Sequence, residues 1–320
     1  MNRKLVDRIA NAVLYEGYIL YPYRPSIKNR QRWTFGGLYP EGYCQTGNGE
    51  AFNNQTECLV QGSSATTVEI VVRFLHLIER RSDEQGVHSW QEAEEREVRL
   101  DCVTLGELAS GPRSVDFAFP GGRRSEPLPG TAGELVREQQ DIQGSVEVKA
   151  SQVAEELFRV TVRVINRAPL EEGFRANRDA ALLRTLVSAH SLLGVQNGAF
   201  VSLLDPPDCW REAAAACRNI GVWPVLVGVE GQTDAMLASP IILYDYPQIA
   251  PESPGDFFDG TEIDEMLTLR ILTLTDDEKR AMAAVDERAR GLLERTESLA
   301  REQMLRLHGT MRTAEESTHG

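Results

Sequence analysis

The sequence predicts an α+β fold with an antiparallel β-sandwich-like N-terminal half, an α/β C-terminal half and a long C-terminal helix. Three patterns predict it. Between residues 61 and 170, apolar and polar side chains alternate in short runs, as they do in antiparallel strands. Between 171 and 274, helical spacing alternates with short apolar runs, which is typical of α/β domains. From 276 to 308, apolar residues repeat at heptad spacing.

The first predicted element is a helix over residues 2–20, because Leu5, Ile9 and Val13 recur at helical spacing. The helix must end before Pro22, since the prolines that follow favour an extended path.

Turn residues punctuate the β-sandwich-like half and separate short alternating runs. In the last run, valines at 160, 162 and 164 alternate with polar residues. The stretch from Pro120 to Gly144 is rich in Gly, Pro and charge, so we expect a long mobile loop there. Five strands are predicted, over residues 66–78, 96–103, 115–119, 144–150 and 157–166.

In the α/β half, leucines at 182, 183, 186 and 193 indicate a helix. The elements predicted for this half are helices over 180–193 and 210–218, and strands over 199–204, 223–229 and 241–244.

The long C-terminal helix begins with a capping box at Thr275-Asp276-Asp277-Glu278, and Gly309 ends it. Its length is about 50 Å, so it must pack along the body, project, or pair with another chain. The heptad spacing favours self-association, and we predict a homo-oligomer. The apolar seam consists of Met282, Val285, Ala289, Leu292, Thr296 and Leu299.

These patterns divide the chain into five segments. They are an N-terminal helix with a Tyr/Arg-rich segment (1–60), the β-sandwich-like domain (61–170), the α/β domain (171–274), the long helix (275–309) and a disordered tail (310–320).

Composition limits the classes of function. The net charge of −14 argues against general binding of nucleic acid or anionic lipid, which needs a positive field. No segment reaches the roughly 18–20 apolar residues of a membrane span, and the N-terminus lacks the apolar core of a signal peptide. We therefore expect a cytoplasmic protein. The five cysteines are widely spaced without a Cys-x-x-Cys motif, which favours reduced thiols over a disulfide framework.

The common catalytic motifs are absent: there is no phosphate-binding loop, dinucleotide fingerprint, Gly-x-Ser-x-Gly elbow or His-Glu-x-x-His. This favours a non-catalytic protein without a cofactor.

A divalent metal site is the alternative, in a metal-binding protein or a metal-dependent enzyme. His190 is the histidine nearest to two cysteines, and oxygen ligands in an acidic run would suit a hard cation. Thr261 could instead cap a helix, or the acids could dock a basic partner. The candidate ligands are His190, Cys209, Cys217, Asp256, Asp259, Glu262 and Asp264.

The most unusual stretch is residues 15–43, which holds six of the eight tyrosines and no acid between Glu16 and Glu41. Tyr and Arg are enriched at protein interfaces. Three interpretations remain open: the segment wraps its own core with its arginines on the 252–265 acids, it is a protein interface, or it is a groove for an anion or single-stranded nucleic acid. The candidate interface residues are Tyr18, Tyr21, Tyr23, Arg24, Arg30, Arg32 and Trp33.

Two stretches, Leu14 to Pro25 (LYEGYILYPYRP) and Ser239 to Asp256 (SPIILYDYPQIAPESPGD), carry a family resemblance. The chain resembles an uncharacterised bacterial family encoded beside [NiFe] hydrogenases of the actinobacterial type. The resemblance implies an accessory, assembly or maturation role, with hydrogenase subunits as protein partners, and it implies no catalytic residue.

Overall fold

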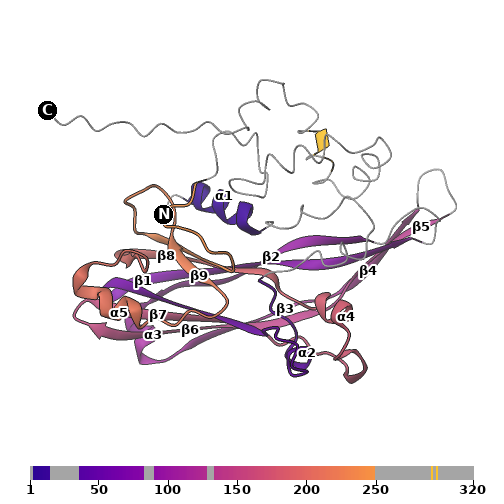
Figure 1. Cartoon of the computed structure of the whole chain (residues 1–320), viewed down its shortest axis with the longest axis horizontal. Coiled ribbons are helices and arrows are strands. Elements are labelled where there is room, and N and C mark those ends of the chain that lie inside the picture. The colour runs from indigo at the N-terminus through magenta and orange to yellow at the C-terminus, as the bar shows by residue number, and fades with distance from the viewer. Residues whose placement is uncertain are drawn as a thin grey trace. The chain divides into compact units, whose positions relative to one another are not determined.

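The structure is a computed structural model that describes residues 3–14, 36–82, 90–127, 133–248, 290 and 293–294 (Figure 1). The chain divides into two compact units, one of residues 1–15 with 33–248 and one of 16–32 with 249–320. The architecture below is that of the first unit.

The first unit is built mostly from antiparallel strands with short helices between them. The strands are β1 (Asn53–Ser82), β2 (Trp90–Thr104), β3 (Arg113–Phe119), β4 (Gly122–Pro127), β5 (Glu134–Gln139), β6 (Ile142–Ala154), β7 (Leu157–Asn166), β8 (Val187–Val201), β9 (Trp223–Leu226) and β10 (Ala235–Ser239). The α-helices are α1 (Arg3–Leu14), α2 (Glu41–Cys44), α3 (Leu105–Ser110), α4 (Arg178–Leu182) and α5 (Arg211–Ala215), and the 3₁₀ turns are η2 (Glu172–Phe174) and η3 (Asp208–Trp210).

The strands form two layers that share β1. The first part of β1 pairs with β7, which continues through β6 to β3. The second part pairs with β2, while β8 follows β1 on its other side and leads to β10 and β9. In Figure 1 the strands β6 and β7 lie below β2, β8 and β9. At its end β1 also pairs with β5, which forms a hairpin with β4.

The register of β1 against β8 shifts between Gly62 and Thr67, where β1 changes from one layer to the other. The chain is tightly packed here. A Cβ at Gly62 would stand 2.3 Å from the side-chain oxygen Oγ1 of Thr66, and one at Gly198 would stand 2.6 Å from the Gln61 carbonyl oxygen. Thr66 Oγ1 donates to the Asn197 carbonyl at 2.7 Å and accepts from the Ser63 amide at 2.9 Å. Glycine is therefore required at this crossing.

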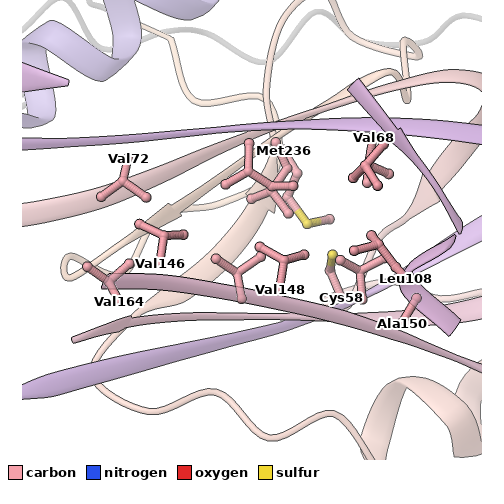
Figure 2. Packing of buried hydrophobic residues seen from close by; sticks show 14 of the residues in the cluster. Cys58, Val68, Val72, Leu108, Val146, Val148, Ala150, Val164 and Met236 are labelled. Carbon is pink, nitrogen blue, oxygen red and sulfur yellow. The ribbon is translucent and has the colours of Figure 1, made fainter. Parts of the chain in front are cut away.

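The main core fills the space between the layers. Figure 2 shows Val68, Val72 and Met236 opposite Val146 and Val148. The alternation that predicted the strands is what aims one side-chain row of each strand at this core.

The outer face of the β8–β9 layer is covered by α1. Its apolar residues Val6, Ile9, Ala10 and Val13 follow helical spacing and form one cluster with strand residues such as Leu192 and Leu237. In Figure 1 this helix lies above β8 and β9.

The predicted α+β class is wrong, because the described residues form a mainly antiparallel β-structure. The C-terminal half is not α/β: β8, β9 and β10 join the same hydrogen-bonded sheet as β1, across the predicted domain boundary at 170/171.

The helix predicted over 180–193 is the main source of this error. The helix α4 ends at Leu182, and β8 begins at Val187. On β8, Ala189 and Leu193 face the main core while Leu192 faces α1, so both faces are buried. A strand that is covered on both faces is a continuous apolar run, which spacing alone does not distinguish from a helix.

Two smaller predictions also fail. The expected loop over 120–144 contains the β4–β5 hairpin, in which Arg137 pairs with Glu126 and with Glu92 at 2.5 and 2.8 Å. Ion pairs and backbone pairing hold this hairpin together, and Leu135 is its one buried apolar side chain. Residues 241–244 form no strand, and the hydrogen bonds that join this part of the chain to β9 are those of Asp245 and Tyr246.

Most of the Tyr/Arg-rich segment and of the C-terminal helix lies outside the described residues. The longest described helix is α1, with 12 residues, and of the predicted C-terminal helix Arg290, Leu293 and Glu294 are described and helical. Across the described ranges, no helix has the length and hydropathy of a membrane span.

Candidate functional site

The seven candidate interface residues between Tyr18 and Trp33 lie outside the described residues. Two other tyrosines of the Tyr/Arg-rich stretch are described, and both are buried. Tyr39 stacks on Tyr43 with ring centroids 5.3 Å apart, and Arg178 donates a hydrogen bond to the Tyr39 hydroxyl at 2.9 Å. Burial raises the pKa of the Tyr39 hydroxyl above its ordinary value. This end of the stretch therefore belongs to the protein's own core.

The candidate Cys/His ligands are spread over the fold. His190 is buried on β8, Cys209 is exposed, and Cys217 packs beside a cluster that includes Val201. His190 lies eleven positions before Val201 along β8, near the other end of that strand. No group of three or more metal-ligating side chains occurs in the part of the chain that the structure describes. The four carboxylates between 256 and 264 lie outside that part.

Large apolar side chains are exposed mainly between residues 204 and 244. Four of them flank β9, and we call these four the β9-edge patch: Ile220, Trp223, Ile242 and Tyr244, with exposed fractions of 52, 44, 73 and 85%. Exposed apolar side chains that gather on one part of a folded protein often mark a contact surface. Trp and Tyr are also the residues that most often anchor interfaces.

Segment 240–246 places two members of the patch. It leaves β10 at Ser239, which is opposite Trp223, and it reaches the Leu226 end of β9 at Tyr246. It therefore runs along the whole length of β9. Ile241 and Leu243 pack against the cluster under α1, and the alternation turns Ile242 and Tyr244 outward.

Asp245 fixes this segment to β9. Its Oδ1 accepts a hydrogen bond from the Leu226 amide at 2.7 Å, and its Oδ2 accepts one from the Ser202 hydroxyl. The Tyr246 amide donates to the Leu226 carbonyl at 2.7 Å, and the Tyr246 hydroxyl donates to the Gln232 carbonyl at 3.0 Å. Ile242 and Tyr244 are thus exposed on a segment that is held in place, which lowers the entropy lost when a partner orders them.

The other end of the patch is fixed to β1. Ile220 exchanges two backbone hydrogen bonds with Gln55, at 2.8 and 3.0 Å. Beside it, Asn219 accepts from the Glu57 amide at 2.8 Å, and the Glu57 carboxylate accepts from the Arg218 amide, also at 2.8 Å. Two more, from the Gln55 side chain to the Arg218 carbonyl and from the Asn219 side chain to the Glu57 carbonyl, bring to six the hydrogen bonds that hold the loop carrying Ile220.

The backbone of β9 is closed to a further strand. Pro224 has no amide hydrogen, and both backbone polar groups of Leu226 are occupied by Asp245 and Tyr246. A partner must contact this edge through side chains. Residues 199–248, which carry the patch, contain six acids and two arginines, so this part of the chain is acidic.

The sequence contained one sign of this site. Residues 241–244 read as a short apolar run that follows Pro240. Their exposure could not be predicted, because it depends on how Asp245 folds the segment beside β9. Comparison with known proteins finds no family model and no curated protein that matches the chain.

Proposed function

We propose that the protein is a non-catalytic accessory protein that binds a partner protein through the β9-edge patch. The observation that carries the proposal is the exposure of Tyr244 and Ile242, at 85% and 73%, on a segment fixed by Asp245. A rigid aromatic side chain buries a large area on binding at little cost in entropy.

The acidic character of residues 199–248 favours a partner whose contact face is apolar at its centre and basic at its rim. Hydrogenase subunits are the first partners to test, because Ile242 and Tyr244 lie within one of the two stretches that carry the family resemblance. The proposal does not depend on that partner, since it rests on the chemistry of the patch.

The test is affinity purification from the native host with quantitative mass spectrometry. A double variant, Ile242→Ser with Tyr244→Ser, is compared with the wild type. Two hot-spot side chains together contribute several kcal/mol to the free energy of binding. We therefore expect recovery of the partner to fall at least about thirtyfold.

The matched control is Val153→Ser with Phe174→Ser, which removes two exposed apolar side chains from β6 and η2. It should leave recovery unchanged. Equal recovery of the same partners by the wild type and the patch variant would overturn the proposal.

A further inference from the structure

The strand β3 is the outermost strand of its layer. It pairs with β6 from Arg113 opposite Val148 to Phe119 opposite Ile142. Along its other side, no described residue forms a hydrogen bond to the β3 backbone. An edge of this kind accepts a further strand unless something blocks it.

The outer strands β9 and β2 are protected in ways that β3 is not. The edge of β9 is blocked by Pro224 and by the hydrogen bonds of Asp245 and Tyr246. In β2, seven of the eleven residues from 91 to 101 are charged, and charge on an outer strand discourages pairing. Between 114 and 119, β3 has one charged residue, Asp116.

The core is also uncovered at this edge. Phe117 and Phe119 lie against the core with ring centroids 5.8 Å from the buried Phe74, yet both remain partly exposed. Arg96 covers part of Phe119, with its guanidinium carbon 4.9 Å from the ring centroid. An added strand would place its own inward side chains over these rings.

We propose that β3 pairs with β3 of a second copy, antiparallel and about a two-fold axis at Phe117. This interface is separate from the β9-edge patch and does not rest on the proposed function. In an antiparallel pair, opposite residues share a face. Odd-numbered residues, which face the core, must therefore stand opposite odd-numbered residues of the second copy.

That condition leaves few registers. An axis at Asp116 sets two carboxylates opposite each other, which is unfavourable. An axis at Val115 sets Arg113 opposite Phe117 and leaves Phe119 beyond the partner strand. An axis at Ala118 overlaps little of either strand before Pro120, which has no amide hydrogen. With the axis at Phe117, the two copies of Phe117 meet and Val115 meets Phe119.

On the exposed face, the same register places Asp116 of one copy opposite Ala118 of the other. Ala118 is exposed, so a charge at this position has little effect on the fold of a single copy. The substitution Ala118→Lys would create two opposite-charge pairs across the interface. The substitution Ala118→Glu would create two like-charge pairs.

Analytical ultracentrifugation of the full chain over a concentration series tests the proposal. For the wild type we expect a species of twice the 35.6 kDa monomer mass that increases with concentration. Self-association should be about tenfold weaker in Ala118→Glu and as tight or tighter in Ala118→Lys. Circular dichroism checks that each variant is folded.

A double variant isolates the pairing from any loss of folding. Asp116→Lys added to Ala118→Glu restores opposite charges across the axis and should restore the dimer. A monomer at every concentration would overturn the proposal, and so would a wild-type dimer that Ala118→Glu leaves intact.

Discussion

Asp245 Oδ1 accepts a hydrogen bond from the Leu226 amide at 2.7 Å, and this contact fixes the segment that presents Tyr244 beside β9. The same carboxylate accepts from the Ser202 hydroxyl, whose oxygen accepts from the amides of Leu204 and Asp205. One side chain thus joins two loops and one strand.

Replacing this carboxylate should release the segment. We expect Asp245→Ala to lower the free energy of unfolding by about 1–3 kcal/mol, because the Leu226 amide loses its partner. Partner binding should weaken as well, since the patch is no longer held in place. Urea denaturation measures the first effect. Asp245→Asn, which keeps an acceptor for Leu226, should be milder, and equal losses in the two variants would contradict this account.

Asn166 is a second point where one side chain joins separate segments. Its Nδ2 donates to the carbonyls of Leu38 and Arg184 at 2.7 and 2.8 Å, and its Oδ1 accepts from the Ala168 amide at 2.8 Å. It is fully buried, so Asn166→Ala leaves the Arg184 carbonyl and the Ala168 amide without partners, while the Leu38 carbonyl keeps its hydrogen bond from the Leu186 amide. We expect a loss of about 3 kcal/mol or more in the free energy of unfolding.

The control for Asn166 is Asn177→Ala, which removes the cap of α4 at an exposed position. That change should cost about 1 kcal/mol by the same urea measurement. A loss at Asn166 no larger than the loss at Asn177 would mean that water replaces the three hydrogen bonds.

The crossing of β1 and β8 should not tolerate a methyl group. We expect Gly198→Ala to destabilise the fold by about 1–3 kcal/mol, because the new Cβ would stand 2.6 Å from the Gln61 carbonyl oxygen. Gly122→Ala is the matched control, since nothing lies within 4 Å of a Cβ there. Thermal or urea unfolding compares the two, and similar stabilities would show that the crossing can relax.

Two buried histidines should make stability depend on pH. Burial lowers the pKa of both His76 and His190 from 6.5 to about 4. For His76, Nε2 donates to the Gln140 carbonyl at 2.7 Å, and the Arg96 guanidinium lies 3.5 Å from Nδ1. The positive charge of Arg96 disfavours the protonated ring, so this site stabilises the neutral one.

Between pH 6.5 and about 4, the unfolded chain therefore binds more protons than the folded protein, and the free energy of unfolding falls as the pH is lowered. Each histidine contributes on the order of 3 kcal/mol over this window. Above pH 6.5 this contribution to the free energy of unfolding is fully present. Urea titrations at several pH values should show a shallower dependence for His190→Gln than for the wild type, and an unchanged slope would contradict the assignment.

The β-half was largely predictable because apolar and polar side chains alternate along its strands. The run at 157–166 was predicted with the bounds of β7, and 115–119 lies within β3. The prediction failed at β8. Because α1 covers the outer face of this strand, apolar residues lie on both of its faces, and the alternation with polar residues that usually marks a strand is missing. The β4–β5 hairpin was missed because ion pairs such as Arg137–Glu126 hold it and Leu135 is its one buried apolar side chain, which is too few for an alternating pattern.

The candidate site was less predictable than the fold. Nothing in the neighbouring sequence distinguishes Tyr244 from Tyr39, yet Tyr244 is 85% exposed and Tyr39 is 3% exposed. The difference arises from long-range contacts: Arg178 covers Tyr39, while Asp245 turns Tyr244 outward. Neither contact has a signature in the local sequence.

The most direct test of the central claim is photo-crosslinking in the native host, with a benzoylphenylalanine at position 244 in place of Tyr244. The account predicts one dominant crosslinked protein at position 244 and none when the same group replaces Phe174, another exposed aromatic residue. Crosslinking at 174 alone, or no adduct at 244 while the partner still co-purifies, would contradict it.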